Sequence, residues 1–189
     1  IAVSDDEAFK YIEVISDISE DPSVYTDLKN ELLHKEKNTM DSLALRKLKG
    51  TIRKRESLAA TRYIGIPDDQ VHFLNLPFYE SGKIKKNPPS QQDIDITNQL
   101  IQSVKPHQIF AAGDLADPHG THRICLEILF DSITQLKTAP FMKDCWVWLY
   151  RGAWQEFEVH EIEMAVPMSP DQVLRKRKAI FYHQSQKDS

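Results

Sequence analysis

The first third of the chain carries apolar side chains at helical spacing. The clearest run is Phe9, Ile12, Ile15 and Ile18, whose spacing is near 3.6 residues. Three acidic residues precede this run, at the position where a helix N-terminus favours negative charge. Pro22 and Ser23 interrupt this run, and further leucines at helical spacing follow them. Gly65 is expected to end the last helix of the series as a C-cap. The pattern therefore predicts a helical region over residues 4–66.

Beyond residue 66 the pattern changes to alternating strands and helices. Strands are predicted at 71–78, 108–114, 144–152 and, as an edge strand, 157–168. Helices are predicted over residues 93–104, along the apolar face at 125–136 and from Pro170 onward. This alternation favours a mostly parallel sheet covered by helices on both faces. We expect one α/β domain over residues 1–189.

The composition is that of an ordinary globular protein, with a net charge of -4 and 9% aromatic residues. No apolar run approaches the roughly 20 residues that cross a bilayer, so we expect neither a membrane span nor a signal peptide. We expect neither a membrane nor a nucleic acid as partner, because the basic stretch 29–62 is typical of solvated helix faces. Cys125 and Cys145 lie in segments predicted to be buried, which favours free thiols and a cytoplasmic location.

Most of the candidate chemistry lies in one stretch, GDLADPHGTHR, at residues 113–123. It follows a predicted strand, and ligands of parallel sheets bind at the carboxyl ends of strands. His119 and His122 could act at one site as a metal ligand and a proton donor, with Asp114 and Asp117 orienting their rings. Alternatively, Asp117 or Thr121 caps the following helix and the histidines are polar loop groups. From these residues alone we favour the alternative, because a zinc site needs more ligands.

A resemblance changes this balance. Residues 50–186 resemble the LmbE/PIG-L family of zinc-dependent de-N-acetylases, whose members carry an RxxE helix, a Leu-Gly or Ile-Gly turn and a motif close to Asp-x-His-Pro-Asp-His. The matching positions are Arg53 and Glu56, then Ile64 and Gly65, and then Asp117, His119 and His122. Two segments, DPHGTHR and KAIFYHQSQ near the end, are similar to the version of this domain that is fused behind glucosamine-6-phosphate deaminase.

The resemblance implies a hydrolase that acts on a carbon–nitrogen bond and removes the N-acyl group of an N-acetylglucosamine-like sugar. It implies that His122 binds zinc or another divalent metal, and that His119 and Asp117 are catalytic, His119 donating to the oxyanion. It also implies that Arg53 approaches the sugar or its phosphate while Glu56 holds the helix, with Asp114 in a supporting role. From the residues alone, Arg53 and Glu56 could equally be a salt bridge on a helix surface.

Two departures from the family pattern shape the remaining expectations. Thr121 stands where the family has Asp, and the family's first motif, Pro-His-Pro-Asp-Asp, has no counterpart in the chain. That motif supplies two metal ligands and the general base, so we expect an incomplete metal site and no activity in this chain alone. The chain begins with Ile-Ala-Val, which reads as the tail of a strand, so we expect it to be part of a longer protein.

These observations together predict a Rossmann-like three-layer α/β/α fold that lacks the family's first strand. The expected partners are an amino sugar, a deaminase domain upstream in the parent chain, and a second copy that pairs with the open sheet edge. The alternative function is a non-catalytic interaction or regulatory module of the fusion protein. Four aromatic side chains could stack a sugar ring: Trp146, Trp148, Tyr150 and Trp154. Trp146 and Trp148, however, alternate in an apolar strand, which is more typical of sheet core. Residues 183–186 have no role that the sequence indicates.

Overall fold

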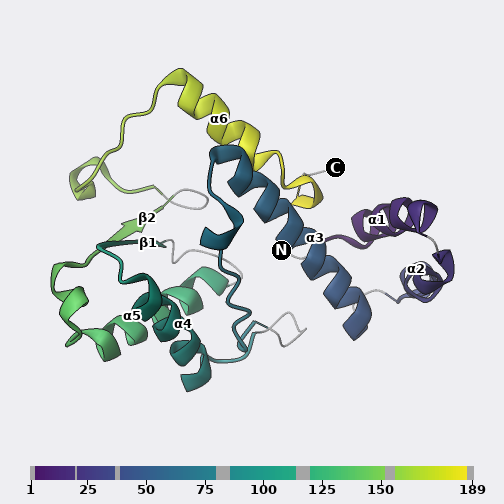
Figure 1. Ribbon diagram of the computed structural model, residues 1–189, viewed down its shortest axis with the longest axis horizontal. Helices are drawn as coiled ribbons and strands as arrows, with labels where there is room; N and C mark the ends of the chain where they lie inside the picture. The colour runs from purple at the N-terminus through teal and green to yellow at the C-terminus, as the bar shows by residue number, and fades with distance from the viewer. Residues whose placement is uncertain are drawn as a thin grey trace. The chain divides into compact units, whose positions relative to one another are not determined.

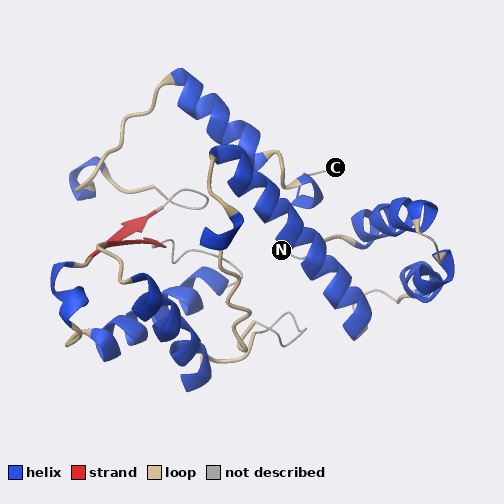
Figure 2. Cartoon of the chain, viewed as in Figure 1, coloured by secondary structure: helices blue, strands red, loops and turns tan. Residues whose placement is uncertain are grey.

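The computed structural model describes residues 3–19, 21–36, 39–79, 86–113, 120–151 and 156–186. The chain forms two compact units, shown in Figure 1: unit 1 consists of Ile1–Phe73 and Pro167–Ser189, and unit 2 of Leu74–Val166. The described part is mixed α/β, with mostly helices and a short parallel sheet that Figure 2 shows in red. Four residues singled out in the sequence lie outside the described residues: Asp114, Asp117, His119 and Trp154.

Unit 1 is helical. Its described elements are α1 (Asp5–Ile18), η1 (Pro22–Tyr25), α2 (Thr26–His34), α3 (Leu43–Ile64), η2 (Asp68–Gln70), α6 (Pro170–Ile180) and η5 (Gln184–Gln186). The predicted helical region over residues 4–66 is thus confirmed, with Pro22 opening a new turn after α1. Ser4 caps α1 by accepting a hydrogen bond from the Glu7 backbone N–H at 3.1 Å. The core of the unit lies where α1 meets α3 and contains Val3, Ala8, Leu45 and Ile52.

The carboxyl end of α3 is closed by a glycine and by an arginine from α6. Gly65 has a φ of 95°, and its N–H donates to the Arg62 carbonyl at 3.0 Å. Gly65 is therefore the C-cap that the sequence predicted. Arg175 of α6 donates to the Ile64 carbonyl at 2.9 Å, and the rings of Tyr63 and Tyr182 lie 5.3 Å apart. The α6 helix and Tyr182 after it are thereby fixed to a helix more than one hundred positions earlier.

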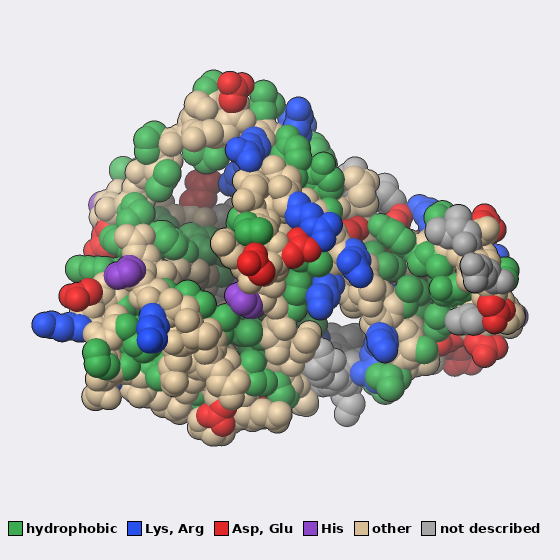
Figure 3. All heavy atoms as spheres, viewed as in Figure 1, with side chains coloured by type: hydrophobic (Ala, Val, Ile, Leu, Met, Phe, Trp, Pro, Cys, Tyr) green, Lys and Arg blue, Asp and Glu red, His purple; other side chains and the backbone are tan. Residues whose placement is uncertain are grey.

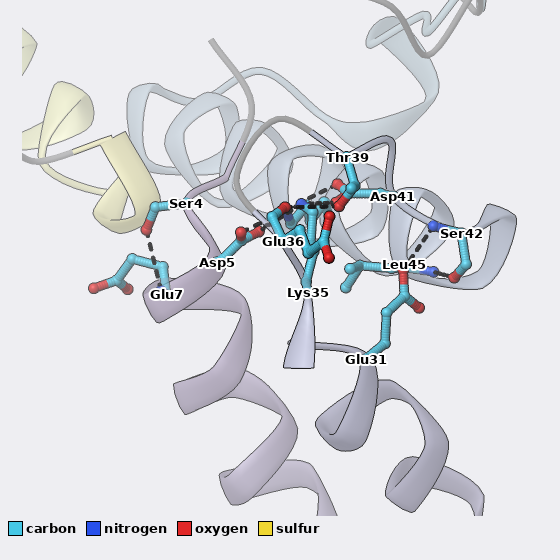
Figure 4. A network of polar contacts seen from close by, with 11 residues as sticks. Ser4, Asp5, Glu7, Glu31, Lys35, Glu36, Thr39, Asp41, Ser42 and Leu45 are labelled. Atoms are coloured by element: carbon cyan, nitrogen blue, oxygen red, sulfur yellow. Dashed lines mark hydrogen bonds and ion pairs between the residues drawn. The ribbon is translucent and has the colours of Figure 1, made fainter. Parts of the chain in front are cut away.

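A cluster of two lysines and two aspartates holds the start of α1 and the connection before α3, as Figure 4 shows. Lys49 of α3 lies 2.5 Å from an Asp5 oxygen and 2.9 Å from an Asp41 oxygen, and Lys35 pairs with the same two carboxylates. Burial alone would raise the pKa of Asp5 and Asp41, but the two lysines outweigh it and hold both pKa values below the usual range. Part of the basic charge over residues 29–62 is therefore neutralised within unit 1.

Unit 2 contains α4 (Gln91–Val104), β1 (Gln108–Ala112), α5 (Thr121–Leu136), η3 (Pro140–Asp144), β2 (Trp146–Tyr150) and η4 (Val159–Glu161). The strands β1 and β2 are parallel neighbours, with Gln108 opposite Trp146 and Ala112 opposite Tyr150. The predicted helices at 93–104 and 125–136 and the predicted strands at 108–114 and 144–152 are confirmed, with shifted ends. A core of Phe78, Ile94 and Ile128 joins α4 and α5.

Two predicted strands do not form. Residues 71–78 are irregular, because Asn75 adopts a φ of 49°, which turns the backbone out of an extended path, and Phe78 instead packs into the core of unit 2. Residues 157–168 alternate in polarity but contain only the turn η4. Alternation supplies side chains that suit a sheet, but a strand also needs a neighbouring backbone to pair with, and no described strand pairs with this segment.

The burial predicted for two side chains is also wrong. Trp146 is 66% exposed although it lies in β2, where it stacks on Trp148 with ring centroids 6.2 Å apart. Cys125 is exposed on α5, and Cys145 is half-buried immediately before β2. Burial raises the pKa of the Cys145 thiol. Both cysteines are free thiols, as the sequence predicted.

Gly113 is required at the end of β1. Its N–H donates to the Tyr150 carbonyl at 2.8 Å, and a Cβ added there would lie 2.9 Å from the Cβ of Leu149. We expect Gly113→Ala to lower the free energy of unfolding by about 1–3 kcal/mol, measured by urea denaturation. The control is Gly50→Ala, because no atom lies within 4 Å of the added Cβ and alanine favours the helix. Equal destabilisation by both variants would contradict this close approach.

Candidate functional site

In unit 2, the candidate site begins where β1 ends. The chain leaves β1 at Ala112 and enters α5 at Thr121, after Gly120 with a φ of 68°. This is the carboxyl end of a parallel strand, where α/β proteins bind their ligands. His122 is exposed in the first turn of α5. The other histidine of the predicted pair, His119, lies outside the described residues. Within the described ranges no three His, Cys, Asp or Glu side chains lie together in a way that could hold a metal ion.

In unit 1, the two positions of the RxxE motif are neighbours on α3. Arg53 Nη1 lies 3.3 Å from Glu56 Oε2, one helical turn away. The two side chains differ in exposure: that of Arg53 is 34% exposed and that of Glu56 only 6%. A buried carboxylate is costly unless several donors meet it, so this pair differs from an ordinary surface salt bridge.

The additional donors come from the end of the chain. The Ser185 backbone N–H donates to Glu56 Oε1 at 2.7 Å, and the Ser185 hydroxyl donates to Glu56 Oε2 at 2.6 Å. Ser185 is itself buried. No local pattern in the sequence indicates this contact, because the two residues are 129 positions apart. Its one visible trace is the ending KAIFYHQSQ, which the resemblance singled out without a role.

A third segment also faces Glu56. The pKa of Tyr11 on α1 is raised, first by burial and then by the negative charge of Glu56. Glu56 is therefore surrounded by α1, α3 and η5, and it connects these elements through polar contacts. The arrangement fixes α3 at the level of Arg53, which leaves the Arg53 side chain half-buried at a defined position.

His183 lies beside Arg53, with Nδ1 3.5 Å from Nη1. An arginine side chain has donors and no acceptor, so the guanidinium is the donor in this contact. The two side chains are thus neighbours, and the guanidinium of Arg53 is supported by a buried carboxylate.

A shallow open pocket of about 260 Å³ lies near the same end of unit 1, lined by Tyr63, Lys178, Phe181, Tyr182 and Gln184. Basic side chains follow α3 and α6 on the face shown in Figure 3. Among the described helices, none is both long and apolar enough to cross a membrane. The surface of unit 1 thus places aromatic rings and basic side chains close together.

The chain is similar to one part of a longer bacterial protein. It is 46% identical, over 200 aligned positions, to a protein of Bacteroides thetaiotaomicron whose name describes it as glucosamine-6-phosphate deaminase-like. That alignment covers all of this chain but spans only 30% of the relative. No protein-family model matches the chain. No solved structure matches it either.

Proposed function

We propose that this chain belongs to a hydrolase-type domain that removes the N-acyl group from a phosphorylated N-acetylglucosamine-like sugar. We place it in cytoplasmic amino-sugar metabolism, in a longer protein with a glucosamine-6-phosphate deaminase-like part. The observation that carries this proposal is Arg53, held half-buried by the buried Glu56 and next to His183. Such donors suit the phosphate that the relative's name mentions, glucosamine 6-phosphate.

The fold that we propose for the domain is the Rossmann-like three-layer α/β/α arrangement. In support, β1 and β2 are parallel neighbours joined through α5, which is the βαβ unit from which such sheets are built. A two-stranded sheet is marginal by itself, so the proposed fold includes further strands from outside the described residues. The stretch 113–123 then follows a strand within the sheet, where catalytic groups gather.

The roles of the remaining site residues are part of this proposal. His119 donates a hydrogen bond to the oxyanion that forms when water attacks the acyl carbonyl. Asp117 acts with His119 as the catalytic carboxylate. Asp114 supports the two side chains. Arg53 binds and orients the anionic end of the sugar, and Glu56 holds α3 in position for it. Arginine suits this task because its planar guanidinium can contact two oxygens of one phosphate.

The resemblance also implies a zinc or another divalent ion at His122. A catalytic zinc ion takes three protein ligands and a water molecule, whereas the described residues supply His122 alone from the implied ligand set. The described residues thus do not make up a metal site, and no step of the reaction is assigned to a metal. We propose that His122 contributes one ligand and that the others belong to parts of the protein outside the described ranges.

The test compares the longer protein that contains this sequence with the 189-residue chain. We expect the longer protein to release acetate from N-acetylglucosamine 6-phosphate, and the short chain to bind zinc weakly and release none. His122→Ala in the longer protein should lower the rate of acetate release at least about 100-fold. Removing a residue that only hydrogen-bonds a metal ligand already lowers metal affinity or activity by about 10–100-fold. His160→Ala, an exposed histidine of η4, is the control. If the folded longer protein releases no acetate from N-acetylglucosamine or its 6-phosphate, the interaction-module alternative is favoured.

A further inference from the structure

We propose that the outward side of α6 is a docking surface for an acidic amphipathic helix of a partner protein. This docking surface lies within unit 1 and is independent of the hydrolase activity proposed above. It is called the α6 face below and consists of five side chains on the side of the helix away from α3: Val173, Leu174, Arg177, Ile180 and Phe181.

Only one side of α6 packs on α3, its neighbour in unit 1 (Figure 1). On that side Ala179 is buried, and Arg175 donates to the Ile64 carbonyl at 2.9 Å. Residues three, four or seven positions apart share one side of a helix, and by this spacing the α6 face lies opposite Ala179. Its four apolar side chains are each between 46% and 57% exposed. A stripe of this kind differs from the singly scattered apolar residues of an ordinary surface.

Basic side chains border the α6 face. Lys176 and Lys178 are exposed and lie on opposite sides of the stripe, because they flank Arg177 in sequence. The guanidinium carbon of Arg177 lies 5.5 Å from the centre of the Phe181 ring, so the apolar stem of this arginine extends the stripe. Within the described residues, the carboxylates that form ion pairs do so with basic side chains other than these three. The border of the stripe is therefore positively charged.

A concave site adjoins the carboxyl end of the α6 face. The pocket of about 260 Å³ shares Phe181 with the stripe and Lys178 with its basic border. Tyr63 of α3 and Tyr182 supply the other aromatic rings of its lining, 5.3 Å apart. An aromatic pocket beside a helical stripe can receive one large side chain of a partner. Such an anchor carries much of the binding energy of a protein interface.

These features favour an acidic helix over two other occupants. A symmetric contact with a second copy would bring the basic borders of both chains together, and like charges across an interface oppose binding. An anionic bilayer suits a basic border and an apolar stripe, but it offers no protruding side chain to fill the pocket. A helix with apolar residues three and four positions apart matches the stripe, and its flanking Asp or Glu side chains meet Lys176 and Lys178.

The experiment measures the binding of two synthetic helical peptides to the complete chain by fluorescence anisotropy. Both peptides have the same apolar seam of leucines with one phenylalanine, and they differ only at the flanking positions, which are glutamate in the acidic peptide and lysine in the basic peptide. We expect the acidic peptide to bind at least about tenfold more tightly, and its affinity to fall as salt is raised. Vesicles of equal parts phosphatidylcholine and phosphatidylglycerol, and sedimentation of the chain alone, test the other two occupants.

Two variants test the charged border and the apolar stripe separately. Lys176→Glu combined with Lys178→Glu should reverse the preference, so that the basic peptide binds more tightly than the acidic one. Leu174→Gln should weaken binding of the acidic peptide about tenfold, because it removes one buried apolar contact of the complex. Circular dichroism verifies that each variant is folded. If the charge reversal prevents folding, the comparison of the two peptides on the unmodified chain and Leu174→Gln decide.

Matched control variants lie at exposed positions of unit 2. Lys137→Glu combined with Lys143→Glu changes the net charge by the same amount, and Val159→Gln replaces an equally accessible apolar side chain. Both controls should leave the two affinities unchanged.

The docking surface is overturned if the acidic peptide does not bind the unmodified chain, or if the two peptides bind alike. It is replaced by a membrane surface if Leu174→Gln abolishes binding to the vesicles but leaves binding of the acidic peptide unchanged. It is replaced by a contact between copies if the chain sediments as a dimer that Leu174→Gln separates.

Discussion

Replacing Glu56 by alanine is expected to lower the free energy of unfolding by about 3 kcal/mol, the cost of breaking a buried, hydrogen-bonded charge pair. The loss has two parts. The Ser185 N–H and hydroxyl, which donate at 2.7 and 2.6 Å, lose their acceptor in a buried environment. Arg53 loses the carboxylate that lies 3.3 Å from its Nη1. Urea denaturation followed by circular dichroism measures the change.

Two further variants show whether Ser185 is the main partner of Glu56. Ser185→Ala removes one of the two donors and keeps the backbone N–H, so it should cost less, about 1 kcal/mol. The double variant should cost less than the sum of the single changes, because both remove the same contact. Glu127→Ala, on the exposed surface of α5, should stay within about 0.5 kcal/mol of the unmodified chain. An effect of Glu56→Ala no larger than that of Glu127→Ala would contradict the buried position of Glu56.

Replacing Asp93 by alanine is expected to destabilise unit 2 by about 2–4 kcal/mol, because this carboxylate organises the start of α4. Asp93 is fully buried and accepts from the Ser90 N–H at 2.8 Å, the Ser90 hydroxyl at 2.6 Å and the Phe78 N–H at 3.0 Å. It therefore closes the capping box of α4 and fixes Phe78, a residue of the core. The exposed Asp95 on the same helix provides the control, as Asp95→Ala removes no buried contact.

The same carboxylate makes the stability depend on pH. Burial by itself would raise the pKa of Asp93, but the hydrogen bonds from Ser90 and from the backbone of Phe78 outweigh burial and hold the pKa below its usual value. Because the folded pKa is lower than the unfolded value of about 3.9, the stabilisation is complete well above pH 4 and is lost as the pH falls through the folded pKa. Unfolding free energies measured between about pH 7 and pH 3 should fall less steeply for Asp93→Asn than for the unmodified chain. Equal slopes would show that Asp93 titrates alike in both states.

Local patterns predicted the helices well because the information for a helix is local. The apolar spacing of α1 and the glycine after α3 are properties of neighbouring residues, and both predictions are confirmed. Strands depend on pairing with distant backbone, so the alternation over 157–168 could not show whether a partner strand is present. At 71–78, the single left-handed residue Asn75 decided the outcome.

The candidate site illustrates the same limit for function. The motif predicted Arg53 and Glu56 as neighbours because they are three positions apart on one helix. It could not predict His183 and Ser185 as their partners, because that contact depends on how the chain end packs against α3. The clearest signal was that the ending KAIFYHQSQ combines polar residues with an apolar helix end. The roles of Asp114, Asp117 and His119 remain predictions, since these residues lie outside the described ranges.

The placement of Ser185 against Glu56 has a consequence for synthesis on the ribosome. Unit 2 is continuous in sequence, from Leu74 to Val166, so all of its contacts are available once that stretch has emerged. Unit 1 is interrupted by unit 2, and its buried carboxylate has no Ser185 donors until the tail has been translated. Since proteins fold unit by unit, we expect a released chain that ends at residue 180 to protect unit 2 from proteolysis while α3 is still cleaved.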